Sequence, residues 1–218
     1  MKTDINNWVK ECINCQKAKI NVYTKSPIQP IEIPKSRFEH IHMDIVGPLP
    51  VSNNCKYILT IIDRYSRWPE AYAIKDISTN TIVQTFFNNY ISRFGVPIKI
   101  TVDRGKQFTS TLFNQLTNML GTHKIHSSSY HPQANGMVER FHRQLKTSIL
   151  TSNNVKNWTE LLPSILLGIR SSVKDELQCS PAELVYGQCL RLPGEIIVNQ
   201  PEIVSSHYLL TKLKQYFD

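Results

Sequence analysis

The feature that most constrains the fold is a set of three strand-like segments whose connections are too short to hold helices. These segments are residues 40–46 (HIHMDIV), 57–63 (YILTIID) and 68–74 (WPEAYAI). The continuous apolar run at 57–63, with its β-branched residues, is typical of a buried strand. Because a parallel neighbour needs a crossover of about a dozen residues or more, we expect the three strands to pair antiparallel.

The hydrophobic period then changes from that of strands to that of helices. Residues 78–94 predict a helix, because apolar residues recur at every fourth position between a serine and a glycine. A strand at 98–102, a helix at 110–120 and a weak strand at 124–127 follow. Strand–helix–strand units favour parallel pairing with right-handed crossovers. The sequence therefore predicts an α/β fold, with a mixed five-stranded sheet and helices on both faces.

Three more helices are expected at 136–150, 157–169 and 180–186. Pro163 either kinks the second of these helices or marks a boundary in it. The third begins with S-P-A-E, the pattern of a capping box with proline at the first helical position. Residues 127–135 (SSSYHPQAN) indicate a polar loop that leads to a helix N-terminus, where backbone N–H groups favour phosphates. An ordinary surface loop is the alternative for this segment.

Composition excludes several classes of protein. Hydrophobic residues make up 41% of the 218 residues, which is enough for a core and too many for a disordered chain. No apolar run approaches the roughly 18 residues of a membrane span, and the N-terminus lacks the apolar stretch of a signal peptide. The five cysteines are odd in number and scattered, so we expect no disulfide framework and a reducing, intracellular location.

Positive charge is concentrated in the middle of the chain. The formal net charge is +8, and residues 40–150 hold 12 basic and 6 acidic side chains. Such a balance is expected of a segment that meets a polyanion, although it could merely keep the chain soluble. Between residues 77 and 159 the only carboxylates are Asp103 and Glu139. Acids in so basic a stretch are either ion-pair partners or metal ligands.

Three acids occupy positions from which they can converge. Asp44 lies in the first predicted strand, Asp103 directly follows the strand at 98–102, and Glu139 lies near the start of the helix at 136–150. Three bare carboxylates close together repel one another and become protonated unless a cation lies between them. A hard divalent cation with oxygen ligands, Mg²⁺ above all, meets this need.

The helix at 136–150 has two distinct stripes. Glu139, Arg143 and Lys146 follow one line along it, which suits a metal ligand beside a phosphate path. A plain ion pair between Glu139 and Arg143 is the alternative. The buried stripe is expected to consist of Val138, Phe141, Leu145 and Ile149.

These residues and their surroundings resemble the integrases of retroviruses and of gypsy-type long-terminal-repeat retrotransposons. Asp44, Asp103 and Glu139 fit the Asp–Asp–35–Glu signature of that family, with 35 residues between the second acid and the third. The resemblance extends from Phe38 to Pro193. The flanking segments that match, in the same order, are HMDIVGPLP, ILTIIDRYSRWPEA, FGVPIKITVDRGKQF, YHPQANGMVERFHRQLK, LLGIRSS and SPAELVYG.

The resemblance implies an RNase H-like fold and a polynucleotidyl transferase that acts on DNA. Asp44, Asp103 and Glu139 would hold two Mg²⁺ or Mn²⁺ ions. Water would first trim the 3′ ends of the element, and the new 3′-hydroxyl would then attack target DNA. Double-stranded DNA is the implied partner, together with further copies of the chain, a nuclear location and an origin in a polyprotein. The expected DNA contacts are Tyr130, Gln133, Asn135, Arg143 and Lys146.

Two other functions are compatible with the same family resemblance. The chain could be a domesticated host protein that keeps the fold for DNA binding without catalysis, although loss of the three acids would be its usual sign. It could also be an RNase H-like nuclease that cleaves RNA–DNA hybrids. Strand transfer and hybrid cleavage on defined oligonucleotides distinguish these functions.

The family also implies a zinc module of two histidines and two cysteines at the N-terminus. Cys12 and Cys15 have metal-ligand spacing, but no histidine precedes residue 40. We therefore expect residues 1–20 to be a remnant of the module with an incomplete zinc site, which binds Zn²⁺ only if other ligands are supplied. His40 and His42 are expected to be strand residues rather than those ligands. The predicted divisions are 1–20, a linker at 21–37, the catalytic core at 38–195 and a tail at 196–218.

Overall fold

A computed structural model describes residues 2–11, 34–127, 132–152 and 154–193 of the chain. The chain divides into two compact units, Met1–Pro30 and Ile31–Asp218. In the first unit the described part is helix α1 (Lys2–Glu11), and the second unit contains all the other elements. No helix within the described ranges is both long enough and apolar enough to cross a membrane.

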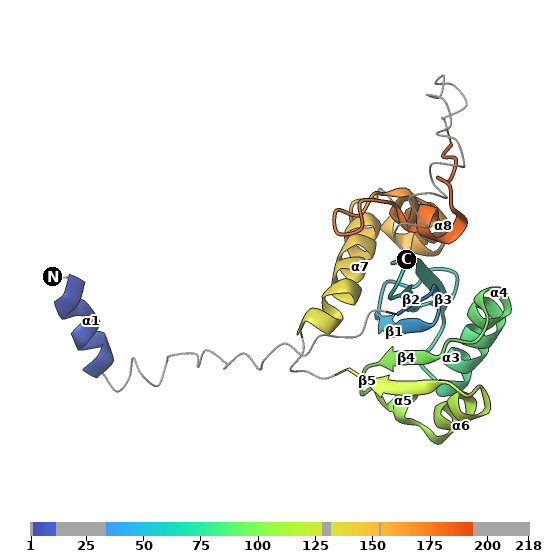
Figure 1. The fold of residues 1–218 in the computed structure, drawn as a ribbon, viewed down its shortest axis with the longest axis horizontal. Coiled ribbons are helices and arrows are strands. Elements are labelled where there is room, and N and C mark those ends of the chain that lie inside the picture. Colours follow the sequence, from blue (N-terminus) through green and yellow to red (C-terminus); the bar gives the residue numbers. More distant parts are fainter. Residues whose placement is uncertain (1, 12–33, 128–131, 153, 194–218) are drawn as a thin grey trace. The chain divides into compact units, whose positions relative to one another are not determined.

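The second unit is built on one mixed sheet with the strand order β3-β2-β1-β4-β5 (Figure 1). Strand β1 pairs antiparallel with β2, which pairs antiparallel with β3. On its other side β1 pairs parallel with β4, which pairs parallel with β5. The predicted five-stranded mixed sheet is thereby confirmed. The strands are β1 (His40–Val46), β2 (Tyr57–Asp63), β3 (Pro69–Ile74), β4 (Lys99–Val102) and β5 (His123–His126).

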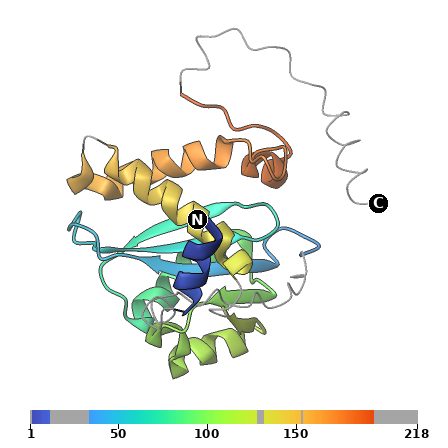
Figure 2. The ribbon, with the colours of Figure 1, turned by 90° about the vertical axis from the view of Figure 1, so that its left-hand side faces the viewer.

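Helices cover both faces of the sheet, as predicted (Figure 2). The side chains of Ile41 and Met43 in β1 enter one core, under the helices that follow β3 and β4. Val46 enters the other core, under the two long helices that follow β5. The first layer consists of α3 (Thr79–Thr85), η1 (Phe86–Ile91), α4 (Ser92–Phe94), α5 (Lys106–Thr109) and α6 (Thr111–Met119). The second layer consists of α7 (Pro132–Leu150) and α8 (Trp158–Ser171), joined by the short turn η2 (Val155–Asn157), and α9 (Pro181–Tyr186) follows α8.

The predicted helix at 78–94 is present, with one difference. Ser78 caps it by accepting a hydrogen bond from the backbone N–H of Thr81, and Gly95 ends it with φ of 81°. Its middle, Phe86–Ile91, is a π-helical turn. In an α-helix, side chains four residues apart do not lie exactly above one another, and a row of them slowly winds around the helix. The wider π-helical turn shifts the side chains back in the opposite direction, so Phe86 and Tyr90 both reach the core.

Two further element boundaries differ from the sequence prediction. Helix α7 begins at Pro132, so Gln133 and Asn135 belong to its first turns and not to a loop. Proline is favoured at the first position of a helix, because its missing N–H would have no partner there. Helix α8 continues through Pro163, which lies inside it and marks no boundary.

A buried acid ties the two helical layers together at the outer strand β3. Glu70 is 2% exposed, and its carboxylate accepts hydrogen bonds from Arg170 of α8 at 2.7 Å and from Arg93 of α4 at 3.3 Å. The indole N–H of Trp68 donates a third hydrogen bond, of 2.8 Å. Since the two arginines come from opposite faces of the sheet, Glu70 holds both layers to the same edge.

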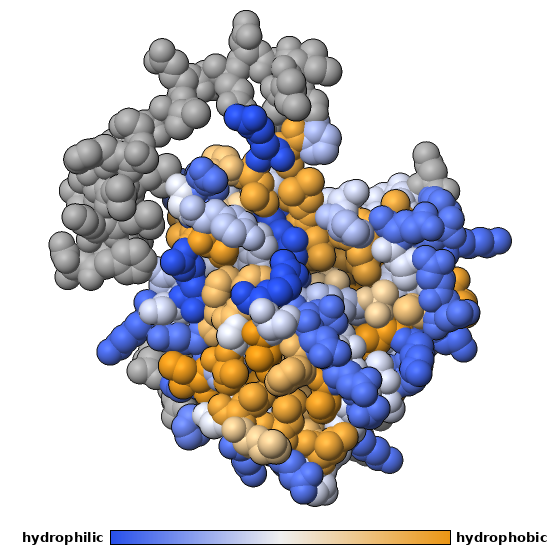
Figure 3. All heavy atoms as spheres, turned by 90° about the vertical axis from the view of Figure 1, so that its right-hand side faces the viewer, coloured by the Kyte–Doolittle hydropathy of each residue, from blue (hydrophilic) through white to orange (hydrophobic). Residues whose placement is uncertain are grey.

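The side of the molecule that carries α4 has an extended apolar surface (Figure 3). Phe87 of η1, a large apolar residue, is 50% exposed.

Candidate active site

The first two predicted acids lie next to each other in the sheet. The parallel register of β1 and β4 places Met43 opposite Val102, so Asp44 and Asp103 occupy the next pair of positions. Neighbouring strands are about 4.8 Å apart. The Oδ1 atom of Asp44 accepts a hydrogen bond of 2.8 Å from the N–H of Ile45, and Oδ1 of Asp103 accepts one of 2.9 Å from Gly105.

The carboxylate of Asp103 lies close enough to Asp44 to act on its pKa. Burial raises the pKa of Asp44, the hydrogen bond from Ile45 opposes that rise, and the negative charge of Asp103 adds to it. The charge of Lys146 lowers the pKa again, but the net shift is upward. A cation bound between the two carboxylates would relieve the repulsion that the charge of Asp103 exerts on Asp44.

Glu139, the third predicted acid, lies on α7 with an exposed side chain. Within the described part of the chain, no three side chains of His, Cys, Asp or Glu are close enough to hold a metal ion. The structure therefore brings Asp44 and Asp103 together, and the convergence of Glu139 with them stays a prediction. Helix α7 is anchored over β1 and β2, because Val138 and Phe141, which flank Glu139 in the sequence, enter the core on that face of the sheet.

His142 is a site residue that sequence analysis did not identify. Its Nε2 lies 2.8 Å from the hydroxyl oxygen of Thr60, and its Nδ1 lies 3.9 Å from Oδ2 of Asp44. Burial, with a contribution from the charge of Lys146, lowers the pKa of His142 to about 4. The ring is therefore uncharged at neutral pH and forms no ion pair with Asp44. Its position one helical turn after Glu139 was the available signal.

Two more histidines lie on the same face of β1. His40 and His42 stack with ring centroids 5.4 Å apart, and Nε2 of His40 lies 2.8 Å from the hydroxyl of Thr101. Burial is the main cause that lowers the pKa of His40 to about 4 and that of His42 to about 3. The positive charge of Arg64 acts in the same direction. Both are strand residues, as expected, and both are neutral.

The predicted DNA contacts are only partly described. Arg143 and Lys146 are exposed on α7. The charge of Lys146 acts on Asp44 and His142, whereas Arg143 lines a hollow of about 480 Å³ between α7 and α8. Tyr130 lies outside the described residues, as do Cys12 and Cys15. The structure describes the backbone of Gln133 and Asn135 but not their side chains.

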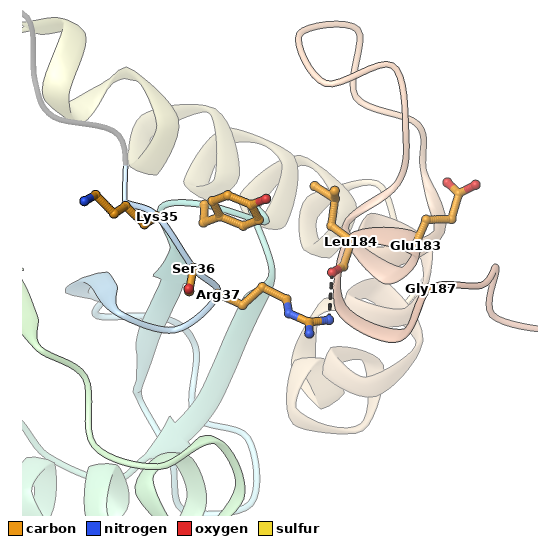
Figure 4. A pocket seen from close by; sticks show the side chains of 7 residues that line it. Lys35, Ser36, Arg37, Glu183, Leu184 and Gly187 are labelled. Carbon is orange, nitrogen blue, oxygen red and sulfur yellow. Dashed lines mark hydrogen bonds between the residues drawn. The ribbon is translucent and has the colours of Figure 1, made fainter. Parts of the chain in front are cut away.

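A second hollow, of about 240 Å³, lies between residues 35–37 and α9 (Figure 4). The guanidinium of Arg37 donates hydrogen bonds to the main-chain oxygens of Leu184, at 3.0 Å, and of Val185. These carbonyls lie at the end of α9, where a helix leaves its acceptors unpaired. None of the predicted acids lines this hollow, and the hydrogen bonds of Arg37 join the start of the domain to α9.

Residues 34–132 match the integrase core domain family. This chain contains an integrase core domain. The resemblance inferred from the three acids and their flanking segments is confirmed, and so is the RNase H-like fold class.

Relatives of the integrase core domain are parts of much longer polyproteins. The chain is 34% identical over 152 residues to the Gag-Pol polyprotein of avian reticuloendotheliosis virus, which is 68% of this chain and 13% of the relative. It is 30% identical over 196 residues to the Pol polyprotein from transposon 412 of Drosophila melanogaster, covering 88% and 16%. For the Pro-Pol polyprotein of simian foamy virus type 3 the identity is 29% over 190 residues, covering 86% and 16%. The chain thus spans about one sixth or less of these curated relatives.

Solved integrases share the fold. A chain of the simian T-cell lymphotropic virus intasome, in complex with the PP2A regulatory subunit B56 gamma, has a TM-score of 0.64 at 21% identity, covering 94% of this chain and 72% of that one. The catalytic core domain of BIV integrase has a TM-score of 0.57 at 22% identity, covering 69% and 95%. The HTLV-2 integrase core in complex with magnesium has a TM-score of 0.56 at 15% identity, covering 68% and 97%.

Proposed function

We propose that this integrase core domain is a divalent-metal-dependent polynucleotidyl transferase that trims the 3′ ends of retroelement DNA and joins them to target DNA. One observation carries the proposal. Asp44 lies in β1 and Asp103 directly follows the parallel strand β4, one position beyond the pair Met43–Val102, and the charge of Asp103 raises the pKa of Asp44. Such a pair, in a domain that matches the integrase core family, is suited to binding cations at a phosphodiester.

The donor set fits Mg²⁺ or Mn²⁺. Asp44 and Asp103 offer carboxylate oxygens, the ligands that these ions prefer, and Glu139 is the proposed third ligand. When bound, two such ions activate the attacking oxygen and stabilise the leaving oxygen of an in-line displacement. The HTLV-2 integrase core that shares the fold was solved with magnesium.

The protein's own residues position the carboxylates and the DNA. The N–H groups of Ile45 and Gly105 each hold one oxygen of Asp44 and of Asp103, which leaves the other oxygen of each carboxylate available. Arg143 and Lys146, exposed on the helix that carries Glu139, supply positive charge for DNA phosphates. The proposed nucleophile is water in the trimming step and the 3′-hydroxyl of the element in the joining step, so no covalent enzyme intermediate is required.

The proposed partners are double-stranded DNA, as element ends and as target, and further copies of the chain. The simian T-cell lymphotropic virus relative is part of an intasome, and the HTLV-2 core is in a trimeric form. Access to chromosomal DNA makes the nucleus the proposed location.

A strand-transfer assay on labelled duplex oligonucleotides tests this function. With Mg²⁺ or Mn²⁺ we expect joined products from the parent chain and only background from Asp103→Asn, because an amide is a poor ligand in place of a carboxylate. Asp175→Asn, which changes an exposed acid in the loop before α9, is the matched control and should be fully active. An Asp103→Asn variant as active as the parent would disprove the proposal. Cleavage of an RNA–DNA hybrid without strand transfer would instead identify a nuclease.

A further inference from the structure

Arg64, directly after β2, is a half-buried cation with no carboxylate partner among the described residues. Its Nη1 lies 3.2 Å from Nε2 of His42, and neither the neutral nor the protonated form of that ring is negative. Burial and the charge of Arg67 both lower the pKa of Arg64, whereas a nearby carboxylate would raise it. The charge of Arg64 is therefore not neutralised by the part of the chain that the structure describes.

Asp63, the acid next to Arg64 in the sequence, binds other groups. It is 1% exposed, and its carboxylate accepts hydrogen bonds from the backbone N–H of Phe38 and from the N–H and hydroxyl of Ser66. These bonds use both carboxylate oxygens. Asp63 therefore holds the turn after β2 together and does not pair with Arg64.

Two further arginines add positive charge beside the β2–β3 turn. Arg67 donates a hydrogen bond to the main-chain oxygen of Arg64. Arg67 and Arg140 both bind the carboxylate of Glu176, at 3.0 Å and 2.8 Å. A single carboxylate balances only one of these two guanidiniums. Because a charge is costly to take out of water without a partner, this group of arginines suits an anion that comes from outside the chain.

Arg64 reaches the face of the sheet on which Asp44 lies. Successive side chains of a strand alternate between its two faces, and Ile41 and Met43 of β1 enter the core under α3. His42 and Asp44 therefore share the opposite face, roughly 7 Å apart along the strand. Because the guanidinium of Arg64 lies next to the ring of His42, it is near enough to Asp44 for one DNA strand to reach both.

We propose that Arg64 binds a backbone phosphate of the DNA that the candidate active site holds. The inference rests on the proposed function, because it assigns a further contact to the same substrate. A guanidinium presents a planar fork of N–H donors that matches a phosphate, and it stays charged throughout the physiological pH range. Arg64 lies at the sheet, whereas Arg143 and Lys146 lie along α7, so the two sets of residues contact different phosphates.

Fluorescence anisotropy of the full chain with a labelled DNA duplex, in EDTA and over a salt series, tests this contact without any metal ion. We expect Arg64→Gln to weaken binding about fivefold to tenfold at roughly 0.1 M salt and to reduce the salt slope by about 0.9, the value for one phosphate. Arg64→Lys keeps the charge and should keep the slope. Lys75→Gln, which removes a charge from an exposed position just after β3, is the matched control and should bind like the parent.

The contact should also be additive with the path along α7. In the double variant with Arg143→Ala and Lys146→Ala, adding Arg64→Gln should reduce the salt slope by about a further 0.9, because contacts with separate phosphates act independently. If its melting curve shows that Arg64→Gln does not fold, Arg64→Met replaces it.

The outcomes separate this inference from the proposed function. A salt slope for Arg64→Gln equal to that of Lys75→Gln overturns the inference. An equal loss of slope in Arg64→Lys and Arg64→Gln also overturns it, since that result marks a structural role. Failure of strand transfer in a chain that binds DNA through Arg64 would refute the proposed function alone. A parent chain that does not bind DNA would contradict both proposals.

Discussion

Asp44 is placed where an ionised carboxylate is unfavourable unless it has a positive partner. Its side chain is 35% exposed, and burial together with the neighbouring Asp103 raises its pKa. A raised pKa means that the folded protein binds this proton more tightly than the unfolded chain does. Below the ordinary pKa of an aspartate this proton stabilises the fold, and the stabilisation is lost as the pH rises through the raised pKa.

Replacing Asp44 by asparagine should therefore stabilise the metal-free protein at neutral pH. Asparagine keeps an oxygen that can accept from Ile45. After a discount for solvent screening, we expect a gain of roughly 0.5 kcal/mol in the free energy of unfolding. Urea unfolding at pH 7 and below pH 4 would measure it, and the gain should vanish in acid. A loss of stability at pH 7 would show that Asp44 is not under this electrostatic strain.

Single residues also show what the sequence could and could not predict. Asp44 and Asp103 were identified because their spacing and flanking segments are local patterns. The position of His142 beside Asp44 depends on a contact with Thr60, which is 82 residues away in the chain, so no local pattern could reveal it. The position of Glu139 relative to the other acids depends in the same way on how α7 packs over the sheet.

An ion-pair bridge fixes helix α7 to the loop that precedes α9. The carboxylate of Glu176 accepts hydrogen bonds from Arg140 of α7 at 2.8 Å and from Arg67 of the β2–β3 turn at 3.0 Å. Burial alone would raise the pKa of Glu176, but its hydrogen bond with Arg67 and the charges of both arginines lower it. The bridge connects Arg140, the residue next to Glu139, with the turn between β2 and β3.

Replacing Glu176 by glutamine should weaken this bridge. A depressed pKa contributes stability above the ordinary pKa of a glutamate and loses it as the pH falls through the depressed value. Because Glu176 is 39% exposed, we expect a loss of only about 0.5 kcal/mol at pH 7, and less in acid. Urea unfolding would measure the loss, with Asp175→Asn as the control. Equal stability of the two variants at pH 7 would exclude a contribution from the bridge.

At the scale of elements, local signals predicted most of the structure. The capping box of α9, with Ser180 and Glu183, and the caps of the helix from Ser78 to Gly95 formed as predicted, because short-range hydrogen bonds determine them. The π-helical turn of η1 and the short helix α5 were missed. The π turn is needed only because the helix packs against the sheet, and that packing is set by tertiary contacts.

The whole molecule has a sheet order that the sequence predicted only in part. The antiparallel pairing of the first three strands followed from their short connections. The central position of β1, between β2 and β4, required the chain to cross the sheet, and it is this crossing that places Asp44 beside Asp103. Glu70, which binds arginines from both helical layers, holds the resulting three-layer arrangement at one edge.

Binding to DNA should be strongly salt-dependent and largely independent of sequence, because neutralising phosphates releases counterions. We expect the double variant with Arg143→Ala and Lys146→Ala to bind duplex DNA more weakly, with a salt slope reduced by about 0.9 for each phosphate that it no longer neutralises. Fluorescence anisotropy over a salt series measures this. The control, Lys56→Ala with Lys75→Ala, removes the same charge from exposed positions at the start of β2 and the end of β3. Equal binding by the two double variants would refute a DNA path along α7.

The central claim, that Asp44, Asp103 and Glu139 hold the ions that catalyse strand transfer, is tested most directly by anomalous diffraction from the protein crystallised with Mn²⁺ and DNA. The account predicts two Mn²⁺ peaks about 3.5–4 Å apart, with Asp44 and Asp103 as ligands and Glu139 bound to at least one ion. Peaks without Glu139 among the ligands, or no Mn²⁺ between Asp44 and Asp103, would contradict it.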